Sequence, residues 1–412
     1  MPPPPNSAGE VPDELTVRLL TDADAPAMHQ LSHLAFGVGR PDPDRPRSVA
    51  PAIRWGVFSP DGRLLAKATD REQRHWFGGR LVDACGVAGV AVAPEARGRG
   101  LARRVLEQLL EDARGRAAVA TLFRTAPALY RRLGFEHVGT LTWYATPTLT
   151  LAGLRVPADV TLRAATLADV PSVRRLYQQV ARTRNGMLDR SGPLFPDDAQ
   201  LLASCDGIIL AVTRDSSGSE VVEGYCSWDR GTGWNGPARL TVWDLLATTG
   251  RGLAALLASL GSWASVLPKV ALRLPDPDPV RWLLPVGDLT VESQQSWMLR
   301  ILDAERAVAQ RPWPRLLSGS VDLTLLDDEW PAPAAPAADG RCRWSFAGGV
   351  GSLEPGGSGE VRLDIRGLSV LYAGAGSAAM LRQAGLLSGP DDADVLLDAA
   401  AAGPAPALLD FF

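Results

Sequence analysis

The stretch from residue 90 to residue 110 has the pattern of a strand, a short loop and a helix. Apolar residues recur up to Val92, the loop contains Gly98 and Gly100, and an amphipathic run begins at Leu101. The first turn of a helix offers backbone N–H groups without partners inside the helix, and the helix dipole favours an anion there. Glycine has no Cβ to keep a phosphate from the backbone. The sequence therefore predicts an anion-binding loop, to which charge-assisted hydrogen bonds can be added by Arg97, Arg99, Arg103 and Arg104.

Spacing excludes two common phosphate-binding loops. The third glycine of the dinucleotide pattern G-x-G-x-x-G would fall at Arg103, and no G-K-S or G-K-T follows, as a P-loop requires. A G-x-G pair alone is not specific, because a strand-to-helix turn with solvated arginines has the same letters. The stretch does resemble the motif V-x-V-x-P-x-x-R-G-x-G-[LI]-[AG] of the GNAT superfamily of N-acetyltransferases. Glu95 departs from the glutamine or arginine that the superfamily often has there.

A second fragment supports the same resemblance. Residues 128–135 read A-L-Y-R-R-L-G-F, which is similar to the superfamily element A-x-x-[FL]-Y-x-x-x-G-F. Taken alone, Tyr130 would be interpreted as a packed helix tyrosine. Its spacing after the first motif favours a catalytic role instead.

Length and composition limit the remaining possibilities. A chain of 412 residues is expected to form two or three domains, and a net charge of −4 favours neither nucleic acid nor an anionic membrane as partner. The proline-rich residues 1–14 lack the regions of a signal peptide and are predicted to be a disordered tail, and no apolar run is long enough to span a membrane. We expect a cytoplasmic protein. The four cysteines lie far apart without a C-x-x-C pair, so neither a metal site nor a disulfide framework is expected.

Two short motifs occur twice, which indicates an internal repeat. The pattern T-x-x-D-x-P stands at residues 21–26 and again at 166–171, and G-R-G-L-A stands at 98–102 and again at 250–254. We therefore expect a catalytic domain over residues 15–152 and a second copy over residues 153–288. The second copy is expected to be degenerate and structural, because Ala255 and Leu256 replace two arginines and no Y-x-x-x-G-F element follows. A second coenzyme site there remains an alternative.

Residues 289–412 have a different character and are predicted to form an α+β domain. A helix is expected over residues 297–306, strands over 319–325, 340–347 and 360–365, and a glycine-rich hairpin loop over 348–359. Further segments at 368–372, 378–384 and 396–401 complete this domain. The chain ends in the apolar run L-L-D-F-F, which we expect to be docked rather than frayed.

The whole chain resembles the Eis (enhanced intracellular survival) family of GNAT N-acetyltransferases. The C-terminal pieces that carry this resemblance are residues 299–303, 361–365 and 371–374 and the terminal phenylalanine. The fold it implies is α/β and α+β, with tandem GNAT-like acetyltransferase domains followed by a sterol-carrier-protein-like C-terminal domain. It further implies acetyl-CoA as co-substrate, aminoglycoside-like or polyamine-like small-molecule amine acceptors, a homo-hexamer, and a C-terminal tail that enters the active site of the first domain.

The resemblance also assigns roles to residues. Tyr130 would be the general acid, the α-carboxylate of Phe412 the general base, and Phe36 would border the acceptor. Family members often place an acid near the position of Phe36, whereas glycine and valine fill residues 37–39 here. The residues that would hold the coenzyme are Val90, Ala91 and Val92 for the pantetheine arm, Gly98, Arg99, Gly100, Leu101, Ala102 and Arg103 for the pyrophosphate, and Thr125 and Ala126 beside it.

This chemistry is consistent with the ordinary acidities of the two groups. A tyrosine with a pKa of about 10 is protonated at neutral pH and can donate to a departing thiolate. An α-carboxyl group has a pKa of about 3.5, and burial would raise it, as would the nearby charge of Asp410. Two other functions remain open: a protein lysine N-acetyltransferase, and a non-catalytic carrier or sensor that binds lipid and coenzyme A.

Overall fold

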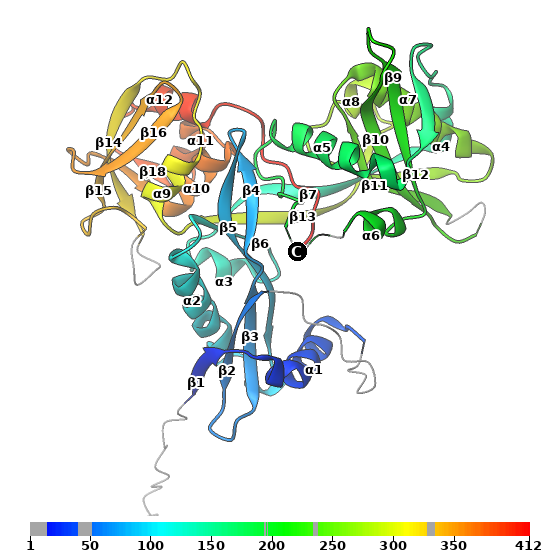
Figure 1. Ribbon diagram of the computed structural model, residues 1–412. Helices are drawn as coiled ribbons and strands as arrows, with labels where there is room; N and C mark the ends of the chain where they lie inside the picture. The colour runs from blue at the N-terminus through cyan, green and yellow to red at the C-terminus, as the bar shows by residue number, and fades with distance from the viewer. Residues whose placement is uncertain (1–14, 40–51, 193–194, 196, 234–237, 328–333) are drawn as a thin grey trace, which may run out of the picture. The chain divides into compact units, whose positions relative to one another are not determined.

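The computed structural model describes residues 15–39, 52–192, 195, 197–233, 238–327 and 334–412. The chain divides into two compact units, coloured along the sequence in Figure 1. Unit 1 comprises residues 1–72 and 85–116, and unit 2 comprises residues 73–84 and 117–412. The strand β5 (Arg80–Val92) therefore contributes to both units.

Unit 1 is an antiparallel sheet with two helices. Its strand order is β1 (Thr16–Leu19), β2 (Ile53–Phe58), β3 (Leu64–Asp70) and then β5. Helix α1 (Ala25–Phe36) follows β1, and helix α2 (Leu101–Arg114) follows β5. The strand that ends at Val92 and the helix that begins at Leu101 were predicted from the sequence and are confirmed. Helix α2 buries residues at three- and four-residue spacing, namely Leu101, Val105, Leu106, Leu109, Leu110 and Ala113.

The pairing of β5 with β3 contains an irregularity just before the predicted anion loop. The register shifts between Lys67 and Thr69, and Gly89 has a φ of +57° in the opposite strand. A bulge of this kind bends a strand and locally frees backbone groups from the ladder. It lies directly before Val90.

Unit 2 contains a long mixed sheet, which is mostly antiparallel. Its order is β6 (Val119–Phe123), β13 (Thr290–Ile301), β7 (Glu136–Pro147), β12 (Lys269–Leu274), β11 (Arg239–Ala247), β10 (Glu220–Arg230), β9 (Gly207–Arg214) and β8 (Thr161–Ala164). The strand β4 (Gln73–Phe77) forms a hairpin with the start of β5. The helices joining these strands are α3 (Pro127–Arg131), α4 (Thr148–Ala152), α5 (Val170–Ala181), α6 (Asp198–Ala203), α7 (Gly250–Gly261) and α8 (Val280–Leu283).

The predicted helix over residues 297–306 is wrong. Residues up to Ile301 belong to β13, and only Ala304–Gln310 form a helix, α9. Residues 297–301 are buried because β13 lies between β6 and β7. A short apolar run buried in this way lacks the polar alternation of a half-exposed strand, so its pattern does not separate strand from helix.

The last part of unit 2 is a second sheet with three helices. Its strand order is β16 (Val350–Pro355), β15 (Arg341–Ala347), β14 (Gly319–Leu326), β17 (Val361–Asp364) and β18 (Leu387–Ser388), and its helices are α10 (Ile365–Ala373), α11 (Ala378–Gln383) and α12 (Asp394–Ala401). The three predicted strands are confirmed. The loop predicted over residues 348–359 is wrong, because β16 runs through it. Only Gly348 and Gly349, with φ of +60° and +90°, form the tight turn between β15 and β16.

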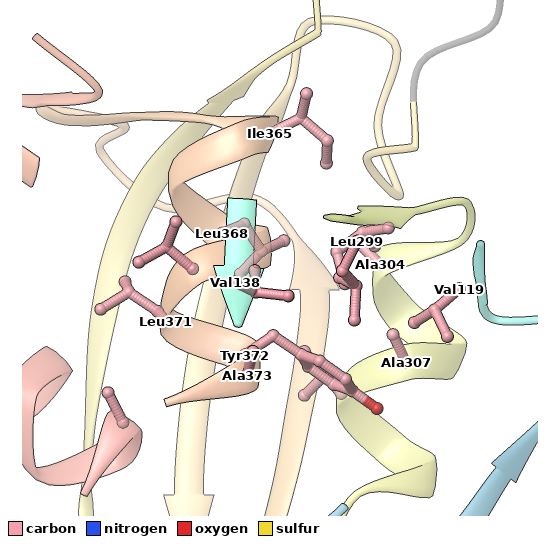
Figure 2. Close-up of a cluster of buried hydrophobic side chains, with 14 of the residues drawn as sticks. Val119, Val138, Leu299, Ala304, Ala307, Ile365, Leu368, Leu371, Tyr372 and Ala373 are labelled. Carbon is pink, nitrogen blue, oxygen red and sulfur yellow. The ribbon is translucent and has the colours of Figure 1, made fainter. Parts of the chain in front are cut away.

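Helix α10 packs against the long strands of the first sheet of unit 2. Figure 2 shows Leu368 of this helix beside Val138 of β7, with Tyr372 of the helix and Leu299 of β13 among the other buried side chains. These side chains belong to one continuous buried cluster. The second sheet and its helices therefore share a core with β7 and β13.

The repeated T-x-x-D-x-P motif produces the same local structure in both copies. The capping threonines have φ and ψ of −116° and 174° at Thr21 and −115° and 173° at Thr166, and each forms a capping box with the aspartate three residues later. Each aspartate also binds an arginine at 2.8 Å, in the pairs Arg18–Asp24 and Arg163–Asp169. Helices α1 and α5 are therefore equivalent elements of the repeat.

Candidate functional site

The loop between β5 and α2 in unit 1 has the geometry expected of an anion cradle. Gly98 and Gly100 have φ of +78° and +74°, and a Cβ at either position would meet no atom within 4 Å. Gly100 is the N-cap of α2, so no side chain caps the helix, and no acid lies in its first turn. A ligand phosphate could therefore approach the first-turn N–H groups.

The arginines around this loop differ in their contacts. Arg103 Nε donates to Glu107 Oε1 at 2.7 Å, and Arg104 Nη2 donates to the carbonyl of Leu15 at 3.0 Å. Arg97 and Arg99 lie exposed on the loop itself. Of the four arginines, these two stand nearest the open glycines in the chain.

Glu95, which departs from the motif, forms an exposed ion pair with Arg63. Hydrogen bonding by its own backbone N–H and by Arg63 keeps the pKa of the Glu95 carboxyl below its usual value. The neighbouring guanidinium therefore balances the negative charge that this residue brings to the loop. No pattern in the sequence indicates this pair, because the two residues are 32 positions apart.

The equivalent helix start in the second copy is closed by its own side chains. Thr249 caps α7 by accepting from the N–H of Gly252 at 3.1 Å, and its hydroxyl donates to Glu223 Oε2 at 2.6 Å. Arg251 Nε donates to the same carboxylate at 2.8 Å, which keeps the pKa of Glu223 low. An anion at this helix end would have to displace the Glu223 carboxylate.

Tyr130 lies in unit 2 on the short helix α3 and is only 3% exposed. Its hydroxyl oxygen is 3.2 Å from Thr125 Oγ1, and its ring meets that of Phe135 edge-on at 6.1 Å. Burial raises the pKa of Tyr130 above its usual value. Thr125 and Ala126 are exposed residues at the start of α3, where Ala126 is the N-cap.

The C-terminal segment is docked in unit 2, as predicted. The N–H of Ala407 donates to the carbonyl of Asn185 at 2.7 Å, and Asn185 Nδ2 donates to the carbonyl of Pro404 at 3.1 Å. Leu408 and Leu409 are fully buried. In Figure 1 this segment, drawn in red, runs from α12 past β7 and β13 to the chain end.

The two terminal phenylalanines have different environments. Phe412 is 8% exposed, with its ring 5.3 Å from that of Phe123 and 6.1 Å from that of His75. Phe411 is 62% exposed, although its ring still packs on Phe123 at 4.7 Å. Phe412 is thus the terminal residue that the fold holds in place.

Asp410, two residues before the chain end, is paired with a guanidinium. Its carboxylate accepts from Arg190 Nε at 3.0 Å, and the hydroxyl of Tyr177 lies 3.3 Å from it. Arg190 also binds Asp244, so one guanidinium joins two carboxylates. The charge of Asp410 is therefore balanced by Arg190.

His75 lies beside Phe412 and is completely buried. Its Nε2 is 3.1 Å from Thr121 Oγ1 and 3.0 Å from Gln73 Nε2, and its Nδ1 faces the carbonyl of Gly186. Burial lowers the pKa of His75 to about 4, so the ring is neutral at pH 7. With the Nδ1 hydrogen directed at the carbonyl, Nε2 acts as an acceptor.

The remaining predicted residues are divided between the two units. Phe36 is the last residue of α1 and is 47% exposed. Val90, Ala91 and Val92 form the end of β5 in unit 1, whereas Tyr130 and Phe412 belong to unit 2. Sequence reasoning missed His75 and the cluster formed by Arg190, Asp244 and Asp410 (the Arg190 cluster), because their partners are distant in the chain and follow no motif.

Within the described ranges, no group of three or more histidine, cysteine, aspartate or glutamate side chains could hold a metal ion. Among the helices that the structure describes, none is long and apolar enough to cross a membrane.

Three protein-family models match successive parts of the chain. Residues 16–138 and residues 186–301 match two acetyltransferase (GNAT) domain models, and residues 304–409 match the sterol carrier protein domain. An uncharacterized N-acetyltransferase of Streptomyces avermitilis is 26% identical over 408 residues, covering 91% of this chain and 92% of that protein.

Solved structures of similar proteins extend over almost the whole chain. A GCN5-related N-acetyltransferase from Kribbella flavida is 29% identical with a TM-score of 0.79, covering 97% of this chain and 99% of its own. One from Anabaena variabilis, at 23% identity, has a TM-score of 0.84, with 97% and 100% covered. Eis1 from Mycobacterium abscessus, at 21% identity, has a TM-score of 0.73 with the same coverage, and it shows the shared fold only.

Together, these matches show two GNAT acetyltransferase domains followed by a sterol-carrier-like domain, as the sequence predicted. They also identify the chain as an acetyltransferase of the GNAT type. The open helix start of α2 lies in the first matched domain, and the closed helix start of α7 lies in the second.

Keeping His75 neutral gives the protein a predictable acid sensitivity. The unfolded chain binds this proton near pH 6.5 and the folded chain only near pH 4. The free energy of unfolding therefore has its full value above pH 6.5 and decreases as the pH falls toward 4. The total loss is about 3 kcal/mol, since each pH unit changes this free energy by about 1.4 kcal/mol. Urea unfolding at pH 7 and at pH 4.5 should show a smaller loss for His75→Gln than for the unchanged protein. The partly exposed His29, changed to Gln, should keep the original loss; an unchanged loss in His75→Gln contradicts the assignment.

Proposed function

We propose that the chain transfers the acetyl group of acetyl-CoA to amines of aminoglycoside-like or polyamine-like small molecules. The observation that carries the proposal is the start of α2, where two open glycines precede a helix that no side chain caps. This is the arrangement that a pyrophosphate needs, and it lies in the first GNAT domain. The closed start of α7 argues for one coenzyme site rather than two.

The loop and the end of β5 supply the coenzyme contacts in this proposal. The bulge at Gly89 supports a role for the following strand end, because a bulge releases backbone groups from the ladder. Arg103 contributes from the first turn of α2 while paired with Glu107. The proposed contacts are the backbone of Val90, Ala91 and Val92 for the pantetheine arm, Gly98, Arg99, Gly100, Leu101, Ala102 and Arg103 for the pyrophosphate, and Thr125 and Ala126 at its border.

Tyr130 is the proposed general acid. Acetyl transfer forms a C–N bond and breaks the thioester C–S bond, and the departing thiolate needs a proton. The raised pKa of Tyr130 keeps its hydroxyl protonated at neutral pH, and Thr125 restricts where that hydroxyl lies. The ring is held by its contact with Phe135.

The α-carboxylate of Phe412 is the proposed general base, which takes a proton from the acceptor amine. The docked tail supports this role, because a base must be held at a fixed position to be effective. Phe123 and His75 pack against the Phe412 ring. Because the phenylalanine side chain has no acidic group, the α-carboxylate is the group of this residue that can act as a base. Phe36 at the end of α1 borders the acceptor in this proposal.

The proposal also includes the family, the location and the assembly of the protein. Membership of the Eis family, a cytoplasmic location and a homo-hexameric assembly belong to the proposal, and light scattering after size-exclusion chromatography tests the assembly. Acetylation of protein lysines and coenzyme or lipid carriage without catalysis are the competing functions. The choice of acceptor decides among them.

Incubation with acetyl-CoA and a panel of acceptors tests the activity. Free-thiol release should exceed the acceptor-free rate with polyamines and aminoglycosides, and mass spectrometry should show an added acetyl group on the amine. Acetylation of a lysine-containing protein but of no small amine would favour the protein acetyltransferase. Coenzyme binding without thiol release for any acceptor would favour the carrier.

Changing Tyr130 to Phe tests the general acid. Removing only the hydroxyl should lower kcat by about 10²-fold or more, as loss of a positioned acid does, and change the KM for acetyl-CoA little. Tyr144→Phe is the matched control, because Tyr144 is also buried and its hydroxyl faces Arg281 instead. An unchanged kcat for Tyr130→Phe removes this residue from the mechanism.

Amidation of the C-terminus tests the general base. A full-length chain prepared by ligation with a terminal amide keeps the Phe412 ring and loses only the carboxylate. Its kcat should fall by about 10²-fold or more at unchanged affinity for acetyl-CoA. A chain ligated by the same route with a free carboxylate should be fully active, and full activity of the amide disproves the role.

A further inference from the structure

The second GNAT domain contains a cavity of about 270 Å³ within unit 2. It lies between the helices α5 and α6 and the strands β10, β11 and β12, and the C-terminal segment closes part of it. The side chains used in the argument that line it are Tyr177, Tyr225, Trp243, Asp244, Arg273 and Asp410. None of these residues has a role in the proposed acetyl transfer.

The cavity occupies the face of this domain opposite the closed helix start. Helix α7 packs on one buried cluster with Leu245 and Cys226, whereas α5 packs on another with Leu246 and Tyr225. Neighbouring residues of a strand point to opposite faces, so the two helices cover opposite faces of the sheet. The second copy is therefore closed at the start of α7 and has a cavity beside α5.

The acidic groups at this cavity already have partners. Arg190 binds both Asp244 and Asp410, and the hydroxyl of Tyr225 donates to Asp244 at 2.8 Å. Arg273 adds a second positive charge 3.3 Å from Asp244, so two guanidinium groups balance the two carboxylates, which offer no unpaired negative charge to a cation. A polyamine is consequently a poor fit for the cavity.

Arg273 provides the remaining polar contact. Its Nε donates to the carbonyl of Trp243 at 2.8 Å, and its Nη2 lies 3.3 Å from Asp244 Oδ1. Its Nη1 has no hydrogen bond to any residue in the described part of the chain. The guanidinium also lies 5.4 Å from the centre of the Trp243 ring, which holds it in place. A carboxylate is the group that a held guanidinium recognises best.

Size and lining complete the description of the ligand. A cavity of about 150 Å³ accommodates benzene in another protein, so the larger volume here accepts one or two rings with a short substituent. The rings of Tyr177, Tyr225 and Trp243 offer aromatic surfaces to such a molecule.

We propose that this cavity is a binding site for a small aromatic carboxylate, whose ring lies among Tyr177, Tyr225 and Trp243 and whose carboxylate meets Arg273. The site is independent of the acetyl-transfer mechanism. Its consequence for activity rests on the proposed function: Asp410 lines the cavity two residues before Phe412, so a bound ligand stabilises the docked position of the proposed base.

Isothermal titration of the full chain with indole-3-acetate tests the site. We expect saturable binding, with affinity at least tenfold weaker for the uncharged indole-3-acetamide. Arg273→Gln should weaken indole-3-acetate binding at least tenfold. The control is Arg214→Gln, which removes the same charge from an exposed position elsewhere in the domain. This variant should bind indole-3-acetate as the unchanged protein does.

A second variant separates loss of binding from loss of folding. Ser204 is an exposed residue that lines the cavity, and Ser204→Trp should fill it while leaving the Arg190 cluster intact. Its thermal unfolding should match that of the unchanged protein, and its binding should be lost. Absent binding, equal binding by the amide or by Arg273→Gln, or displacement of indole-3-acetate by spermidine overturns the proposal.

The effect on activity has a separate readout. Indole-3-acetate should change kcat for acetyl transfer in the unchanged protein and not in Ser204→Trp. If no acetyl transfer is found with any amine, the titration still decides whether the cavity binds the acid. Failure of the site and failure of the proposed function are therefore distinguishable.

Discussion

The position of β13 between β6 and β7 determines how unit 2 is organised. This strand lies at the end of the second matched GNAT domain, yet it pairs with β6 and β7, which precede that domain in the sequence. Its Trp297 is fully buried, and the space for the ring depends on Gly186 and Gly139, where a Cβ would lie 2.7 Å and 3.3 Å from it. Helix α10 packs on the same strands. The C-terminal segment passes close to the same two glycines, with Ala407 beside Gly186 and Pro406 beside Gly139. One strand pairing therefore connects the second GNAT domain, the sterol-carrier-like domain and the chain end.

The two copies of G-R-G-L-A show that a motif's letters do not determine its chemistry. In the first copy the helix start is open, because glycine is the N-cap and no acid follows. In the second copy Thr249 caps the helix, and Glu223 from β10 binds both Thr249 and Arg251. The replacement of Arg103 and Arg104 by Ala255 and Leu256 was visible in the sequence and indicated a degenerate copy. The contribution of Glu223 was not visible, because it depends on the pairing of strands.

Local patterns predicted much of the fold, and contacts between distant residues account for what they missed. The capping boxes at Thr21 and Thr166 and the apolar spacing of α2 act within a few residues, so the sequence alone reveals them. The same reasoning failed for β13, whose burial depends on strands more than 140 residues away. The pair of Glu95 with Arg63 and the buried environment of His75 also depend on tertiary structure. The loop with Gly98 and Gly100 and the start of α2 were therefore predictable as local structure, whereas the surroundings of Phe412 were not.

The ion pairs of Asp410 help to keep the C-terminal segment docked. An unpaired aspartate two residues before the terminus would repel a second carboxylate and favour a displaced tail. Because Arg190 pairs with Asp410, while Asp244 is shared between Arg190 and Arg273, the tail can remain docked with Phe412 packed on Phe123. Breaking a buried pair of this kind leaves an uncompensated charge and is strongly destabilising. Arg190 also lines the cavity in the second GNAT domain, so its pairing with Asp410 connects that cavity to the docked C-terminal segment.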